Sequence, residues 1–180
     1  PWFEVTTIAA SPRSAGKTYE DALAGAKDII AESISDNADY RTRIRELTFK
    51  EGVLTSAAKD AEAKTVYEMY YNFSEPVAKM AGHRILAVNR GENEKILTVK
   101  IEAPVDKILS YLEKQIIVRD NQYTTGIIKE AIEDSYERLI APSIEREIRN
   151  QLTETAEAGA IKVFGKNLEQ LLLQPPITGH

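Results

Sequence analysis

The chain has 180 residues, 43% hydrophobic and 28% charged, a composition typical of a folded protein rather than a disordered one. Its formal net charge of −5 argues against nucleic-acid binding by the chain as a whole, because such binders are usually basic, although a local basic patch is compatible with it. The absence of cysteine excludes disulfides and thiol catalysis and fits a reducing cytoplasm, and no apolar run approaches the roughly 20 residues that cross a membrane.

Residues 1–17 give no clear secondary-structure pattern. They contain scattered apolar residues followed by the loop-like run SPRSAG at 11–16. We expect this segment to be a poorly placed N-terminal tail or a junction. The multihelical part of the chain is expected to start at residue 18.

The first two predicted helices cover residues 18–34 and 39–49. Thr18 is a suitable N-cap, and Asp21 stands three residues later as its capping partner. In the second helix Ile44 and Leu47 are expected to face inward. The inward stripe of the first helix is predicted to be Ala22, Ala26, Ile29, Ile30 and Ile34.

The middle of the chain mixes short elements. Residues 53–56 could form a strand or an extended turn, and residues 61–71 are predicted as a helix because they are rich in Ala, Glu and Lys. Ser74 and Pro76 predict the start of a short helical turn over 77–80, since Pro suits the first helical position. A further short helix is expected over 83–89.

A short β element is predicted near residues 96–102. Leu97, Val99 and Ile101 alternate with polar residues, which is the period of a half-buried strand. A single strand cannot satisfy its backbone hydrogen bonds. Its partner is expected to be 53–57, 116–118 or the N-terminal segment.

The C-terminal part is predicted to be helical over 105–112, 125–140 and 142–173. The last of these helices would be roughly 45 Å long, enough to serve as a spine for other helices. The fold class is therefore mainly α: a multihelical bundle with a long C-terminal helix. The expected inward stripe of that helix is Ile144, Ile148, Leu152, Ala156, Ala160, Val163, Leu168 and Leu171.

Motifs for catalysis, cofactors or metals are not found in this sequence. Gly16-Lys17-Thr18 resembles the end of a phosphate-binding loop, but Ser11 stands where that loop needs a glycine. The carboxylates over 130–137 are best interpreted as a solvated helix face with ion pairs to Lys129 and Arg138. We therefore predict no catalytic residues, no cofactor and no metal, and classify the chain as a non-enzyme.

Two clusters leave alternatives open. His83, Arg84 and Arg90 flank an apolar stripe, and they either form a polar network that fixes helix packing or a basic edge that contacts phosphate; packing is the favoured interpretation. The aromatic residues over 67–73 either belong to the core, which is favoured, or stack on bases.

Five spaced segments, in order, resemble one family, the Tex transcription accessory proteins of bacteria, which are relatives of a eukaryotic elongation factor and histone chaperone. The segments are 22–32 (ALAGAKDIIAE), 70–76 (YYNFSEP), 83–92 (HRILAVNRGE), 138–147 (RLIAPSIERE) and 167–176 (NLEQLLLQPP).

The resemblance implies a region of a longer cytoplasmic protein. Such proteins carry a multihelical region with a helix-turn-helix-like part, followed by an RNase H-like domain, a helix-hairpin-helix domain and an OB-type RNA-binding domain. It implies a scaffold domain over 18–180, with the helix-turn-helix-like part over 18–124 and a helical spine over 125–180 that leads to C-terminal domains missing from this chain.

Two hypotheses of function follow from the resemblance. In the first, the region is a non-catalytic scaffold that contacts the transcription machinery, while nucleic acid binds mainly through domains outside this chain and no membrane is involved. In the second, the helix-turn-helix-like part contacts DNA or RNA directly. The candidate nucleic-acid-binding residues are then His83, Arg84, Asn89 and Arg90.

Overall fold

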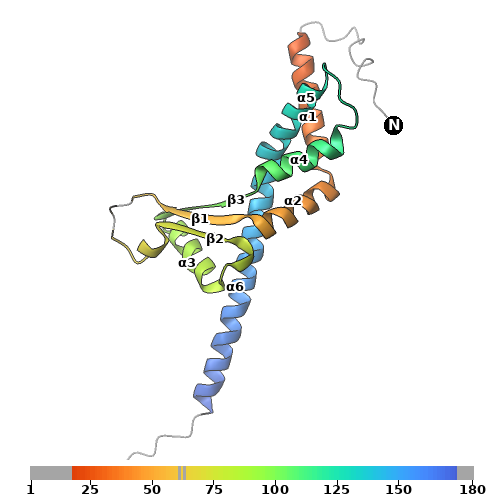
Figure 1. Cartoon of the computed structure of the whole chain (residues 1–180). Coiled ribbons are helices and arrows are strands. Elements are labelled where there is room, and N and C mark those ends of the chain that lie inside the picture. Colours follow the sequence, from red (N-terminus) through yellow and green to blue (C-terminus); the bar gives the residue numbers. More distant parts are fainter. Residues whose placement is uncertain (1–17, 61, 63, 174–180) are drawn as a thin grey trace, which may run out of the picture. The chain divides into compact units, whose positions relative to one another are not determined.

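The computed structural model describes residues 18–60, 62 and 64–173 (Figure 1). The expected tail at 1–17 lies outside the described residues, as does 174–180. The structure is mainly helical with one small antiparallel sheet, which confirms the predicted fold class. The described residues divide into two compact units: unit 1 is built from 18–42 and 106–142, and unit 2 from 43–105, without 61 and 63, and 143–173.

Unit 1 is helical. It contains α1 (Tyr19–Ser35), most of α4 (Val105–Ile116), α5 (Thr125–Asp134) and a π-helical continuation of α5, η4 (Ser135–Ile140). Helix α1 packs against α5 and η4, and Figure 1 shows these segments side by side.

The cap of α1 forms as predicted. The Thr18 side chain accepts a hydrogen bond from the Asp21 amide at 3.3 Å, and the Asp21 carboxylate accepts one from the Thr18 amide at 3.0 Å. The inward face is predicted only in part: Ile34 is buried, whereas Ile29 is 66% exposed and Ala31 is buried instead. The face of α1 is rotated from the predicted stripe because α5 and η4 meet it along Ala31 and Ile34.

Unit 2 is built around the sheet, which has the strand order β2-β1-β3. Strand β1 (Val53–Ala58) pairs antiparallel with both β2 (Asn72–Pro76) and β3 (Leu97–Glu102), so that Thr55 lies opposite Ser74 on one side and Lys100 on the other. The strand predicted near 96–102 is thus confirmed, and its partner is the first of the three candidates. The unit also contains α3 (Gly82–Asn93), which packs against β3, and most of α2 (Ala38–Glu51).

The helix expected over residues 61–71 is not found in the described part of that range. The described residues between 62 and 71 form turns and a short 3-10 helix, η2 (Glu68–Tyr70), rather than an α-helix. The short helical turn predicted over 77–80 is confirmed as η3 (Val77–Lys79), but its expected N-cap, Ser74, lies in strand β2 instead. Pairing with β1 satisfies the backbone groups of this segment, which outweighs its local helix signals. The favoured core position of the aromatic cluster is confirmed for Tyr67 and Tyr70, which are buried.

The final helix, α6 (Ala141–Leu172), has 32 residues and matches the predicted range within one residue at each end. Its inward stripe is confirmed only in the first half, where Ile144, Ile148 and Ala156 are buried. From Glu157 to Leu173 every residue is exposed, so the predicted inward residues Ala160, Val163, Leu168 and Leu171 are not covered by any described residue.

Candidate nucleic-acid interface

The predicted nucleic-acid-binding residues all lie on α3, but they do not share one face. The helix turns Ile85, Val88 and Gly91 into the core of unit 2. His83 and Arg90 are seven positions apart, which places them on the same exposed side, whereas Arg84 and Asn89 point elsewhere.

Arg84 is held by two contacts within unit 2. Its guanidinium donates to Glu75 on β2 at 2.8 Å, and that carboxylate side chain is only 19% exposed. The guanidinium carbon also lies 6.0 Å from the centre of the Phe73 ring, close to the limit for a cation–π contact. Phe73 in turn meets Tyr70 edge to face at 5.3 Å. These contacts tie α3 to the edge of the sheet.

Asn89 belongs to a polar network between α3 and α6. Its amide nitrogen donates to Thr153 Oγ1 at 2.8 Å, and its carbonyl accepts from Arg149 at 3.1 Å. Arg149 also donates to both oxygens of Glu92, one of them at 3.1 Å, in a two-point ion pair. Charge-assisted, two-point contacts fix orientation as well as distance, so this network sets how α3 lies on α6.

Arg149 was not among the residues that the sequence pointed to. A signal was present in principle: Asn89 and Glu92 share a face of α3, and Arg149 and Thr153 share a face of α6. Which face of α6 would meet α3 could not be read from either segment alone.

His83 and Arg90 are exposed. The Arg90 side chain is 77% exposed and forms an ion pair with Glu94 at 3.4 Å, of the kind expected between neighbouring turns of a helix. The role of the four predicted residues in binding nucleic acid stays a prediction. Their geometry divides them into two that hold the fold and two that face solvent.

The edge of the sheet next to α6 is closed by a side chain. Glu145 Oε1 accepts the amide of Ile101 on β3 at 3.0 Å. A free strand edge presents unpaired backbone groups, and a carboxylate placed there blocks pairing with another strand.

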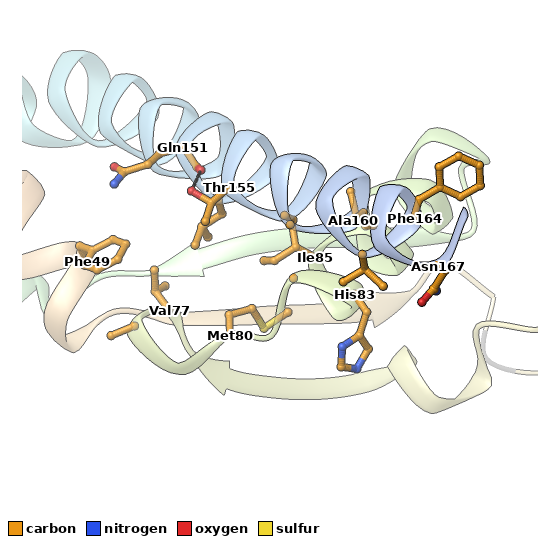
Figure 2. Close-up of a pocket in the computed structure, with 17 residues that line it drawn as sticks. Phe49, Val77, Met80, His83, Ile85, Gln151, Thr155, Ala160, Phe164 and Asn167 are labelled. Carbon is orange, nitrogen blue, oxygen red and sulfur yellow. Dashed lines mark hydrogen bonds between the residues drawn. The ribbon is translucent and has the colours of Figure 1, made fainter. Parts of the chain in front are cut away.

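A groove runs along α6 in unit 2, with a volume of about 810 Å³ (Figure 2). Its base is narrow because a Cβ atom at Gly82 would lie 3.2 Å from the Cα of Ala156. The residues that line it come from the end of α2, from η3 and the start of α3, and from α6: Phe49, Val77, Ala78, Met80, Gly82, His83, Ile85, Leu86, Gln151, Leu152, Thr155, Ala156, Gly159, Ala160, Val163, Phe164 and Asn167.

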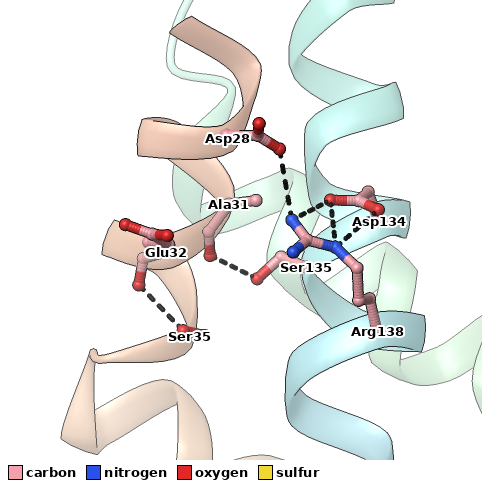
Figure 3. Close-up of polar contacts among 7 residues, drawn as sticks. All are labelled: Asp28, Ala31, Glu32, Ser35, Asp134, Ser135 and Arg138. Carbon is pink, nitrogen blue, oxygen red and sulfur yellow. Dashed lines mark hydrogen bonds and ion pairs between the residues drawn. The ribbon is translucent and has the colours of Figure 1, made fainter. Parts of the chain in front are cut away.

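In unit 1 Asp134 of α5 forms an ion pair with Arg138, as predicted (Figure 3). Lys129 instead pairs with Glu113 of α4, at 3.0 Å. Arg138 donates to Asp134 at 2.8 Å and to Asp28 of α1 at 3.3 Å. The hydrogen bond from Arg138 lowers the pKa of Asp134 from its ordinary value. Beside this pair, the buried Ser135 hydroxyl donates to the Ala31 carbonyl at 2.7 Å. Both contacts join α1 to the α5–η4 segment.

Neither a metal-binding cluster nor a membrane-spanning helix occurs among the described residues. In residues 18–60, 62 and 64–173, no three His, Asp or Glu side chains are grouped so that they could hold a metal ion. Over the same part of the chain, no helix is both long and apolar enough to cross a membrane.

Known proteins resemble this chain over nearly its whole length. The Bacillus subtilis protein YdcI is 55% identical over 90% of this chain and 23% of its own. The human S1 RNA-binding domain-containing protein 1 is 34% identical, over 91% of this chain and 18% of its own. The transcriptional accessory protein Tex of Neisseria gonorrhoeae is 31% identical, over 86% and 21%. The chain thus spans about a fifth of the length of these relatives.

The family model described as Tex central region-like matches residues 7–164. This match confirms the family indicated by the five sequence segments. The chain belongs to the Tex central region-like family.

Proposed function

We propose that this region is a non-catalytic helical scaffold of a transcription accessory protein. Its role is to hold other domains in place and to offer surface to the transcription machinery in the cytoplasm, while nucleic acid binds chiefly through those other domains. The names of the relatives, a transcriptional accessory protein and an S1 RNA-binding domain-containing protein, support a nucleic-acid-associated role.

The observation that carries the proposal is the exposed second half of α6. Ile161, Phe164 and Leu171 are 72%, 68% and 66% exposed, and Leu168, Leu172 and Leu173 are exposed as well. Burying one such side chain is worth about 1.5–3 kcal/mol, so a helix half with several of them is suited to carry a covering domain.

The inner contacts of α3 support the same role. Arg84 is hydrogen-bonded to Glu75. Asn89 is hydrogen-bonded to Arg149 and Thr153. Both side chains therefore contribute to the packing of unit 2. A scaffold needs such orientation-fixing contacts, because it must present its surface in one geometry.

The test is a titration of the 180-residue chain with fluorescent single-stranded RNA and with duplex DNA at physiological salt. At physiological salt, non-specific binding of nucleic acid has a Kd of about 10⁻⁴–10⁻⁶ M, and we expect this chain to bind neither probe more tightly than that. Sub-micromolar binding of either probe would overturn the scaffold proposal in favour of direct contact by the helix-turn-helix-like part.

The exposure of Arg90 gives the direct-contact alternative its own test. If Arg84 and Arg90 touch phosphate, replacing both with Ala lowers the salt slope of binding by about two units. If Arg84 is structural, Arg84→Ala lowers the melting temperature and leaves the slope unchanged. Arg146→Ala, at an exposed arginine of α6, is the matched control for the loss of charge.

A further inference from the structure

Helix α1 is fully buried only at its C-terminal end. Its buried residues, Ala31, Ile34 and Ser35, all lie within the last five positions of the helix. From Tyr19 to Ile30 every residue is half-buried or exposed. Little apolar burial means a low cost of local opening. Residues 19–30, termed the flap from here on, are therefore the part of α1 that separates most easily from its neighbours.

The C-terminal end of α1 is fixed by contacts between uncharged groups. The buried Ser135 hydroxyl of η4 donates a hydrogen bond to the Ala31 carbonyl at 2.7 Å (Figure 3). Ala31 itself is 0% exposed, and Ile34 is 5% exposed. Changes in nearby charge leave such contacts in place, so this end serves as the fixed base of the flap.

The flap is held on the α5–η4 segment by two ion pairs. The Lys27 ammonium of α1 pairs with Glu130 of α5. The next residue of α1, Asp28, pairs with Arg138 of η4 at 3.3 Å. The four side chains are between 32% and 66% exposed, and ion pairs at such sites are individually weak.

Carboxylates outnumber cations at this seam. The pKa of Arg138 is raised first by its hydrogen bond to Asp134, and also by the charges of Asp28 and Glu32, so three carboxylates act on one guanidinium. A further cation beside the seam, Lys129, pairs with Glu113 of α4 instead. The seam therefore sets two cations, Lys27 and Arg138, against four carboxylates, Asp28, Glu32, Glu130 and Asp134.

We propose that Lys27 and Arg138 latch the flap across a seam that is otherwise acidic on both sides, so that the flap opens when either cation loses its charge. Losing a cation leaves carboxylates of α1 facing carboxylates of α5 and η4, which repel. Losing a carboxylate breaks an ion pair but brings the seam closer to neutrality. The latch is thus a charge-sensitive device in unit 1, and it goes beyond the scaffold function because it concerns the opening of one helix.

The two partners of one ion pair provide the test. Lys27→Gln and Glu130→Gln break the same contact and install the same residue, with little change in helix propensity. Amide hydrogen exchange of the 180-residue chain, followed by mass spectrometry, measures opening of the flap. We expect Lys27→Gln to speed exchange of residues 19–30 about fivefold or more, and Glu130→Gln to speed it about twofold or less. Exchange of residues 31–35 should stay unchanged in both.

Two further measurements separate repulsion from other causes. Arg138→Gln leaves the sequence of α1 intact, and it should speed exchange of the flap as Lys27→Gln does. In Lys27→Gln the remaining carboxylates repel, so about 1 M NaCl, which shortens the screening length to about 3 Å, should bring the two variants of the pair closer together. The control is Arg43→Gln, which breaks the ion pair with Glu46 inside α2 and should leave the flap unchanged.

Three results would overturn the proposal. Equal acceleration in Lys27→Gln and Glu130→Gln would mean that only the ion pair matters and that the acidic seam does not. Unchanged exchange in Lys27→Gln and in Arg138→Gln would mean that these cations do not hold the flap. Equal acceleration in residues 19–30 and 31–35 would mean that α1 leaves as a whole. The nucleic-acid titration decides the scaffold function separately from all three.

Discussion

The first and second halves of α6 carry similar apolar residues at helical spacing, yet only the first half is buried. Ile148 is 0% exposed, whereas Leu171 is 66% exposed. The first half packs in unit 2 and exchanges polar contacts with α3, through Arg149 and Thr153. The difference teaches that periodicity identifies the face of a helix that is able to pack, while the neighbours decide how much of that face is covered.

The largest effect is expected from removing a buried side chain in the first half. Ile148→Ala should lower the free energy of unfolding by about 2–5 kcal/mol, because it leaves a cavity in a closed core. Leu171→Ala, in the exposed half, should change it by less than about 0.5 kcal/mol. Urea unfolding followed by circular dichroism measures both. Equal losses would show that the two halves are equally covered in solution.

A second comparison is between Gly82, where α3 lies close to α6, and Gly165, in the exposed half of α6. Gly82→Leu should destabilise the chain by about 1–3 kcal/mol, because its Cβ atom alone would lie 3.2 Å from the Cα of Ala156 and would push α3 away from α6. Gly165→Leu should instead stabilise it by about 0.5–1 kcal/mol, since it adds helix propensity where nothing is in the way. Thermal melts of the two variants should therefore shift in opposite directions. A shift in the same direction would contradict the close approach at Gly82.

The polar network gives a third contrast. Arg149→Ala should cost about 1–2 kcal/mol, because it leaves Glu92 and Asn89 without their partner in a half-buried site. Lys162→Ala in the second half should cost almost nothing. A double-mutant cycle with Glu92→Gln should give a coupling energy of about 0.5–2 kcal/mol. Strict additivity of the two substitutions would mean that the ion pair contributes nothing in solution.

The smallest change in the free energy of unfolding is expected at the C-terminal end of α3, at a residue that does not contact α6 in the contacts described above. Lys95 follows the C-cap of α3, Glu94, and its backbone lies in the left-handed region at φ 61°. Next to it, the Ile96 amide donates a hydrogen bond to the Gly91 carbonyl at 2.9 Å. Glycine adopts this conformation without strain, so Lys95→Gly should stabilise the chain by up to about 1 kcal/mol. Chemical denaturation measures it. Lys100→Gly, in the middle of β3, is the contrasting control and should destabilise.

Much of the fold could be predicted because its signals are local. The cap at Thr18 and Asp21, the alternation of Leu97, Val99 and Ile101, and the length of α6 are each written in a short stretch of sequence. Strand β2 could not be predicted in this way. Its segment carries Ser74 and Pro76, which suit a helix start, and only the pairing with β1 makes it extended.

For the candidate site, too, local features could be predicted from the sequence and long-range contacts could not. That His83, Arg84, Asn89 and Arg90 are polar residues on a helix could be predicted from the segment itself. Their contacts could not, because Glu75 lies on β2 and Arg149 is 60 residues away from Asn89 along the chain. The groove was also missed, since its walls come from three separate segments.

The family, the mainly helical class and the ends of the long helix could be predicted from the sequence, because they depend on local propensity, capping and matched segments. Which residues are buried, which charges are paired and where a groove forms became known only from the folded structure. Those properties depend on contacts between distant segments, and the free energy of such contacts is a property of the packed pair rather than of either segment. The two halves of α6 illustrate this: similar local patterns give a buried spine in one half and an open surface in the other.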